Sequence, residues 1–124
     1  MKAICIFLLI GLNVVSAQNE VHKKAVEKFV TQFNGNDFEG IYESFSPSMK
    51  QSRTKENFLT FFTKLKKQNG NLLKLELLEY NENKVRTSRG IYDGDFETGL
   101  YTVRITVDIR GKITGLLFKR KNLI

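Results

Sequence analysis

The sequence predicts an α+β fold in which three helices come first and a curved antiparallel sheet of about four strands follows. Apolar residues recur every three to four positions up to Gly70 and every second position after it. The chain therefore changes once from helical periodicity to strand alternation. The segments after Gly70 are separated by short turns, which join antiparallel strands. Helices segregated from such a sheet form a two-layer domain.

Turn and cap residues divide the helical half into three segments. The first helix is predicted over about residues 20–33, and Asp37 can cap a short second helix that Ser46-Pro47 ends. The third helix is predicted to start after the N-cap Thr54 and to end at Gly70. We expect the helical phenylalanines to cover one apolar face of the sheet. They are Phe29, Phe33, Phe38, Phe45, Phe58, Phe61 and Phe62.

Strand alternation begins at "NLLKLELLEY", where Leu73, Leu75 and Leu77 alternate with polar residues. This predicts a half-buried strand with the three leucines on its buried face. An irregular strand is predicted over 85–89, a regular one over 90–97, and a last strand over 113–118 before a trailing end. The longest strand alternates without a break. Its inward residues are predicted to be Tyr101, Val103, Ile105, Val107 and Ile109. A sheet that curls around the first helix would enclose an apolar, cone-shaped interior.

The N-terminus has the three parts of a secretory signal peptide. Lys2 precedes an uncharged apolar run, and Ser16 and Ala17 supply small residues at a cleavage site. We therefore expect cleavage near Ala17, a signal peptide at 1–17 and a single domain at 18–124, in a secreted or periplasmic bacterial protein. The apolar run is too short to span a bilayer comfortably, so no membrane span is expected after cleavage.

Cysteine content and charge narrow the function classes. Cys5 is the only cysteine and lies within the predicted signal peptide, so the mature chain can form no disulfide and no thiolate metal site. The formal net charge is +7. The basic residues are mixed with glutamates along the chain, which indicates a solvated surface more than an anionic partner. Export further disfavours nucleic acid as a partner.

Three stretches resemble a family of small exported bacterial domains within the nuclear transport factor 2-like superfamily. They are "FVTQFNGNDFEGIYESFSPSMK" (29–50), "FLTFFTKLKKQNGNL" (58–72) and "GKITGLLFKR" (111–120). The resemblance covers about residues 21–120 and implies a cone-shaped α+β fold. Domains of that family often precede a serine β-lactamase-like hydrolase domain, which implies an accessory role at the cell envelope.

The segment "DGDFETG" (93–99) raises the question of a calcium loop. An EF-hand loop needs glycine at position 6 and a bidentate glutamate at position 12. Counted from Asp93, these positions hold a threonine and Arg104. In an extended segment Asp93, Asp95 and Glu97 share one face. We therefore expect the solvated acidic edge of a hairpin, paired with Arg104 or Lys112, and no metal site.

His22 is the only histidine and has no second histidine or mature cysteine to accompany it. A nucleophile system requires its histidine deep in a pocket beside its partners. The position of His22, just beyond the signal peptide, instead predicts a frayed or surface side chain. General acid–base catalysis needs a titratable group within reach of the substrate, and the inward face of the longest strand is apolar apart from Tyr101. No catalytic set and no cofactor are expected.

Binding is therefore favoured over catalysis. We predict that the domain binds a small apolar ligand or a partner protein, such as one of the cell envelope, through its cone or its sheet face. The candidate ligand-pocket residues are Tyr42, Phe45, Phe62, Tyr92, Tyr101, Val103 and Ile105. The candidate sheet-face contacts are Thr102, Arg104 and Thr106, and the resemblance implies that this face can form a homodimer.

Two other functions remain open. One is a cone-type hydrolase or isomerase that uses a buried carboxylate, such as Asp37 or Glu43, near a tyrosine. An enclosed carboxylate with a raised pKa would support it. The other is an accessory module that assists a separate hydrolase at the cell envelope.

Overall fold

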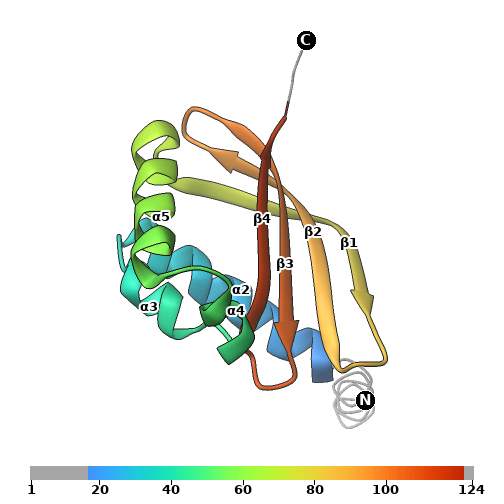
Figure 1. The fold of residues 1–124 in the computed structure, drawn as a ribbon. Coiled ribbons are helices and arrows are strands. Elements are labelled where there is room, and N and C mark those ends of the chain that lie inside the picture. The colour runs from blue at the N-terminus through green and yellow to red at the C-terminus, as the bar shows by residue number, and fades with distance from the viewer. Residues whose placement is uncertain (1–16, 122–124) are drawn as a thin grey trace, which may run out of the picture.

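A computed structural model describes residues 17–121, in which four helices are followed by a four-stranded antiparallel sheet (Figure 1). The helices are α2 (Ala17–Asn34), α3 (Phe38–Glu43), α4 (Pro47–Ser52) and α5 (Lys55–Asn69). The strands are β1 (Leu72–Glu82), β2 (Thr87–Phe96), β3 (Leu100–Asp108) and β4 (Ile113–Arg120), in the spatial order β1-β2-β3-β4. The predicted α+β class is confirmed. The predicted signal peptide, with Cys5, lies outside the described residues except for Ala17, the first residue of α2.

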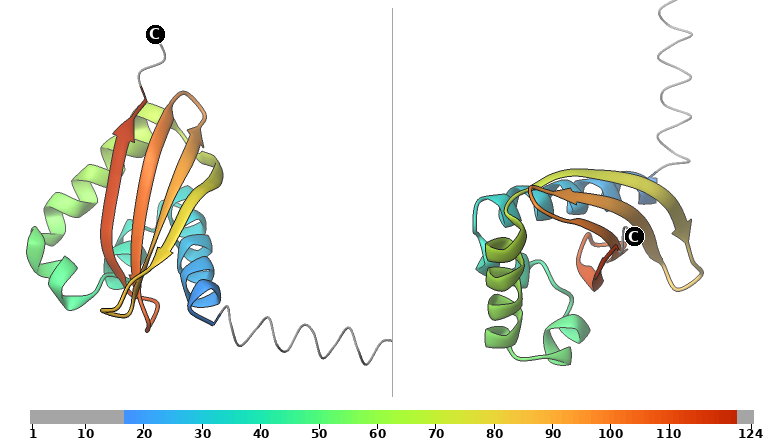
Figure 2. Two further views of the ribbon diagram at one scale, coloured as in Figure 1. Left: turned by 90° about the vertical axis from the view of Figure 1, so that its right-hand side faces the viewer. Right: turned by 90° about the horizontal axis from the view of Figure 1, so that it is seen from above.

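The sheet is curved, and α2, α3 and α5 form a layer on one of its faces, while none of the helices within residues 17–121 covers the other face (Figures 1 and 2). Burial follows this arrangement. Every second residue of β3 from Tyr101 to Val107 is buried beneath the helices, and the residues between them are not. The alternation predicted for this strand is therefore the side-chain pattern of a sheet with one covered face.

Local cap residues set the helix ends where the sequence predicts them. Asp37 and Thr54 each accept a hydrogen bond from a backbone N–H of the first turn of α3 and α5. Gly70 ends α5 with a φ of 79°, a left-handed conformation that glycine adopts without steric penalty. The first helix is longer than predicted, because it covers 17–34 rather than 20–33.

The short second helix, α3, ends before Ser46-Pro47, but the loop expected between Pro47 and Thr54 is wrong, since Pro47 begins the additional helix α4. Ser46 is the N-cap, and its Oγ accepts a hydrogen bond from Met49 N at 3.2 Å. Proline suits the first helical position because its missing N–H would have no partner there. Phe45 lies outside both helices and forms a bridge with Ile113 of β4. This bridge ties the helical layer to the edge of the sheet.

Two β-bulges in β1 change which leucines face the helices. The register with β2 shifts between residues 72 and 74 and between residues 77 and 79, so that Leu73 and Leu78 are the extra residues. Leu75 and Leu77 face the helical layer, as predicted. The prediction for Leu73 is wrong, because the first bulge moves it out of phase and leaves its side chain exposed.

The other strand boundaries differ from the prediction in detail. β2 begins at Thr87. β3 ends at Asp108, whose Oδ1 accepts two backbone N–H groups of the following turn at 2.9 and 3.0 Å. Ile109 consequently lies exposed in the turn. The prediction that its side chain faces inward is wrong. β4 continues to Arg120, which pairs with Tyr101, so the predicted trailing end starts too early.

Aromatic side chains from α2 and α5 form the centre of the core. The ring centroids of Phe29 and Phe62 lie 6.2 Å apart, and those of Phe33 and Phe96 lie 5.7 Å apart, both in edge-to-face arrangements. Six of the seven phenylalanines predicted to cover the sheet are buried in this core or packed against it. The exception is Phe61, which is 45% exposed on the outer side of α5.

Candidate functional site

A groove of about 610 Å³ lies between α2 and the first two strands, where α2 runs beside β1 in Figure 2. Ligand pockets commonly have volumes of about 300–1,000 Å³. The apolar walls of this α2–β1 groove are Val26, Val30, Leu75 and Leu77. Its polar lining includes His22 and Tyr92, with Lys23 and Glu27 on the outer side of α2. The groove thus combines apolar walls with a few converging polar groups.

His22 is the principal correction to the sequence-based interpretation. Its side chain is only 2% exposed, although a frayed or surface position was expected. Its Nδ1 lies 2.9 Å from Ser88 Oγ, and its Nε2 lies 2.8 Å from Tyr92 Oη. The ring of Tyr80 packs edge-on against the imidazole with centroids 5.2 Å apart. A buried polar side chain needs such partners, and His22 has one for each ring nitrogen.

A signal for this position exists in the sequence. His22, Val26, Phe29 and Phe33 are spaced by four, three and four residues, so they share one face of α2. The histidine is therefore in phase with the apolar stripe. Its partners could not be found in this way, because Ser88 and Tyr92 are distant in sequence and become neighbours only through the fold.

The contacts of Ser88 select one tautomer of His22. Ser88 Oγ also lies 3.3 Å from Gln18 Nε2, which can only donate, and 3.4 Å from the carbonyl oxygen of Val107, which can only accept. A serine hydroxyl has one proton and two lone pairs. All contacts are made at once only if Ser88 donates to Val107 and His22 Nδ1–H donates to Ser88. His22 Nε2 then carries no proton and accepts one from the Tyr92 hydroxyl.

Burial keeps this network uncharged. Loss of hydration lowers the pKa of His22 below its ordinary value of 6.5, and a hydrogen bond with the backbone of Ser88 partly opposes that shift. Burial also raises the pKa of Tyr92 to about 12, with a smaller contribution from the neighbouring Tyr80. The imidazole and the phenol are therefore both neutral at neutral pH.

Gly90 makes the orientation of Tyr92 possible. The two residues are two positions apart in β2 and point to the same face. A Cβ added at Gly90 would lie 2.6 Å from the Tyr92 hydroxyl oxygen and 2.7 Å from ring atoms. The phenol ring therefore lies across the glycine, in space that any larger residue would occupy.

The network is suited to orienting a ligand and not to attacking one. A nucleophile must reach the substrate, but the Ser88 side chain is 0% exposed and its hydroxyl is held by three partners. Tyr92 has an aromatic ring that packs and a hydroxyl that can hydrogen-bond, a combination that places a polar tip at the end of an apolar surface.

The predicted pocket residues do not lie together. Tyr92 lines the α2–β1 groove, whereas Val103 and Ile105 are completely buried at the centre of the sheet. Phe45 and Phe62 are packed in the core between the helices and the sheet.

The other two predicted tyrosines lie elsewhere. The ring of Tyr42 has the ammonium groups of Lys50 and Lys55 at 5.3 and 5.6 Å from its centroid. Tyr101 is buried at the far end of β3, where its hydroxyl accepts a hydrogen bond from Asn69 Nδ2 at 2.9 Å.

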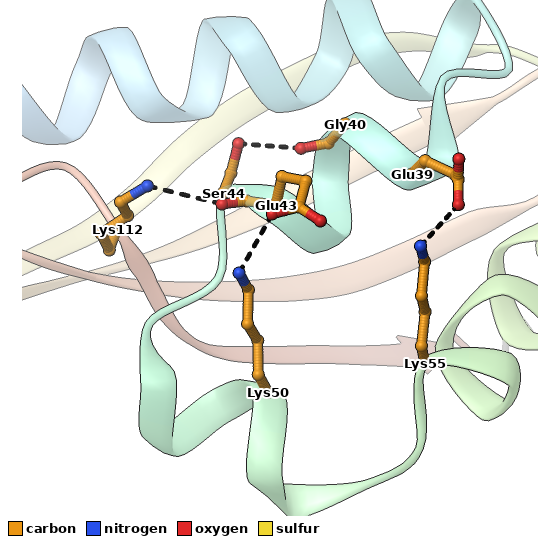
Figure 3. Close-up of polar contacts among 7 residues, drawn as sticks. All are labelled: Glu39, Gly40, Glu43, Ser44, Lys50, Lys55 and Lys112. Atoms are coloured by element: carbon orange, nitrogen blue, oxygen red, sulfur yellow. Dashed lines mark hydrogen bonds and ion pairs between the residues drawn. The ribbon is translucent and has the colours of Figure 1, made fainter.

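The carboxylates considered for catalysis are on the surface. Asp37 is exposed and caps α3. Glu43 pairs with Lys50 at 3.2 Å, and Glu39 pairs with Lys55 at 2.7 Å, across the connection between α3, α4 and α5 (Figure 3). The Lys55 ammonium lowers the pKa of Glu39. These pairs are exposed ion pairs on a helical surface, and the expectation of a buried Asp37 or Glu43 is wrong.

The acidic segment 93–97 forms the strand arm and turn that the sequence predicts. Asp93 lies in β2 and pairs with Lys121, not with either of the predicted cations. Glu97 lies in the turn after β2, where its Oε2 accepts a hydrogen bond from Asn71 N at 2.7 Å. Within residues 17–121, no group of three or more His, Cys, Asp or Glu side chains is placed to hold a metal ion.

The uncovered face of the sheet carries the three predicted contact residues. Thr102, Arg104 and Thr106 alternate along β3 with its buried residues, and Arg104 is exposed. On this face Arg104 is registered between Ile91 of β2 and Leu117 of β4. In the part of the chain that the structure describes, no helix is long and apolar enough to cross a membrane.

Comparison with known proteins identifies the family. No curated protein and no solved structure matches the chain. One family model matches residues 26–116, which is well over half of the sequence and extends from the middle of α2 into β4. That model is described as "Protein of unknown function (DUF3887)". The chain therefore belongs to the DUF3887 family.

Proposed function

We propose that this DUF3887 domain is an exported, non-catalytic binding module that holds a small amphipathic ligand in the α2–β1 groove. The observation that carries the proposal is the groove itself, with about 610 Å³ of space, four aliphatic wall residues and the neutral His22–Tyr92 pair in its lining. Apolar walls with few convergent polar groups are typical of small-molecule sites. We further propose that the curved sheet and its helices form a cone of the nuclear transport factor 2-like type.

Two neighbouring leucines provide a matched test of the groove. Leu77 is 50% exposed and lines the groove, whereas Leu78 is 54% exposed in the second bulge and does not line it. Neither side chain belongs to the buried core, so Leu77→Lys and Leu78→Lys should both fold. Only Leu77→Lys places a charge in the groove.

The assay is titration of the purified protein with decyl amphiphiles. Calorimetry measures the affinity, and amide chemical shifts locate the residues that the ligand contacts. We expect saturable binding to the wild-type protein and to Leu78→Lys, and a loss of about tenfold or more in Leu77→Lys, because a hydrated ammonium would replace an apolar wall and would have to lose water for an alkyl chain to pack there. Shifts should be largest on α2 and β1. Equal affinities for the two variants, or no binding to the wild-type protein, would overturn the proposal.

Export is proposed from the N-terminal pattern of Lys2, the apolar run and Ala17. A host that secretes the protein should release a chain that begins at Gln18. N-terminal sequencing of the released protein is the direct measurement. A chain that keeps Met1 and stays inside the cell would contradict export.

A protein contact through the uncovered sheet face is a second proposed role. The observation that favours it is the mixed polar and apolar surface around Arg104, which is registered between Ile91 and Leu117 and is not covered by any described helix. We expect light scattering at high micromolar concentration to detect a homodimer that Arg104→Glu weakens. A wild-type protein that stays monomeric at that concentration would exclude the homodimer.

A further inference from the structure

We infer that the α2–β1 groove selects a ligand whose neutral head group donates a hydrogen bond, such as an alcohol, to Tyr92 Oη. This inference rests on the proposed function, since it specifies the chemistry of the ligand at the same groove. It follows from the direction of the hydrogen bonds around His22 and from the charges near the groove.

The direction of the Tyr92 hydroxyl is the first step. Ser88 Oγ accepts from His22 Nδ1–H, so the unprotonated Nε2 must accept the Tyr92 proton at 2.8 Å. Among the described residues, His22 is the only hydrogen-bond partner of Tyr92 Oη. Tyr92 lines the groove, and because its proton is engaged with His22, its hydroxyl can serve a ligand O–H or N–H only as an acceptor.

The absence of net charge around this acceptor is the second step. His22 is kept neutral by burial, and the two charged side chains of the groove, Lys23 and Glu27, have opposite signs. A carboxylate head group would direct its own lone pairs at the lone pairs of Tyr92. An ammonium head group could pair only with Glu27 on the exposed side of α2, and it would lose hydration beside the buried imidazole and phenol. A neutral hydroxyl meets neither obstacle.

The apolar walls define the rest of the ligand. Val26 and Val30 lie one and two turns beyond His22 on the same side of α2, opposite Leu75 and Leu77. From His22 to Val30 the helix rises by about 12 Å, at about 1.5 Å per residue. A medium-length alkyl chain attached to the head group can lie along this distance.

Three probes with one alkyl chain separate the possible head groups. Decanol donates and accepts hydrogen bonds, decyl methyl ether only accepts, and decanoate is an anionic acceptor. On the wild-type protein we expect decanol to bind about threefold to tenfold more tightly than the ether, the effect of one neutral hydrogen bond, and decanoate to bind more weakly than decanol. Tyr92→Phe alone would leave His22 Nε2 as a free acceptor, so the test uses His22→Leu/Tyr92→Phe, in which the ratio of the decanol affinity to the ether affinity should fall to about one.

A second measurement does not depend on any variant. His22 is the only histidine of the chain, so its imidazole ¹⁵N signals can be identified without assignment of the whole spectrum. We expect the tautomer with the proton on Nδ1. A proton on Nε2 would turn the Tyr92 hydroxyl into a donor towards the groove and would overturn the inference.

The outcomes distinguish this inference from the function on which it rests. Equal binding of decanol and the ether to the wild-type protein, or tighter binding of decanoate, refutes the donor head group while leaving the groove as a binding site. Failure of all three probes to bind refutes the proposed function. A decanol preference that persists in His22→Leu/Tyr92→Phe removes the Tyr92–His22 pair as the source of the preference and also refutes the inference.

Discussion

Replacement of His22 by leucine tests whether the buried network stabilises the fold. Leucine is apolar and of similar size, so the change removes both imidazole hydrogen bonds, of 2.9 and 2.8 Å, without opening a large cavity. Each neutral hydrogen bond contributes about 0.5–1.5 kcal/mol, which gives a loss of about 1–3 kcal/mol. The Tyr92 hydroxyl also loses its acceptor, which places the expected value towards the upper end of that range.

The pH dependence provides an independent signature of the same residue. Burial lowers the folded-state pKa of His22 below the ordinary value of 6.5, so the unfolded chain binds more protons in that range. The free energy of unfolding should therefore fall as the pH decreases through about 6.5 towards the folded-state pKa. Above about pH 7.5 the full contribution of His22 should be present.

The assay is urea unfolding of wild-type protein and His22→Leu between about pH 7.5 and about pH 5. We expect the wild type to lose stability over this interval and the variant to show a smaller slope, because leucine does not titrate. The loss of unfolding free energy in the double variant His22→Leu/Tyr92→Phe should be smaller than the sum of the losses in the two single variants. In each single variant one polar group stays buried without its partner, whereas the double variant removes both groups. A pH slope that is the same in wild type and His22→Leu would refute the buried, neutral histidine.

Three further predictions concern positions outside the groove. Asn34→Ala removes two side-chain hydrogen bonds, of 2.9 and 2.8 Å, to the backbone of the first residue of β1, and should destabilise the protein by about 1–3 kcal/mol in urea unfolding. Gly90→Ala should lower the melting temperature because its Cβ would meet the phenol ring of β2 at 2.6–2.7 Å, whereas Gly115→Ala, with its nearest neighbour at 3.5 Å, should leave it nearly unchanged. Lys66→Met removes the ammonium that donates to two carbonyl oxygens at the end of α2, at 3.1 and 3.0 Å, and should cost about 1–2 kcal/mol in thermal unfolding. Lys64→Met, on the exposed side of α5, is the control and should change little.

Features determined by neighbouring residues could be predicted from the sequence. Asp37, Thr54 and Gly70 were identified correctly because capping uses a side chain or backbone conformation next to the helix end. Pro47 shows the limit of the same reasoning. Proline disfavours helix at the residue before it but also begins helices well, and the sequence alone does not decide between these effects. The bridge from Phe45 to Ile113, between residues far apart in the chain, fixes the extended link between α3 and α4.

Features determined by distant partners could not be predicted. The bulges that expose Leu73 and Leu78 are mismatches in length between β1 and β2, and they exist only once both strands are paired. Periodicity assigns Leu75 and Leu77 correctly because the segment between the bulges alternates regularly. The groove depends on this register, since a shift by one residue would turn both leucines away from α2.

The position of His22 follows from three properties of the chain taken together. It is in phase with the apolar stripe of α2, so packing of that stripe on the sheet brings it inside. Ser88, Gly90 and Tyr92 occupy alternate positions of β2 and point to the same inner face. The glycine leaves room for the phenol to lie along the strand, so the hydroxyls of the serine and the tyrosine reach the two ring nitrogens from one strand. An imidazole can be buried there at little free-energy cost because both nitrogens are satisfied, and loss of either hydroxyl would favour a more exposed or protonated histidine.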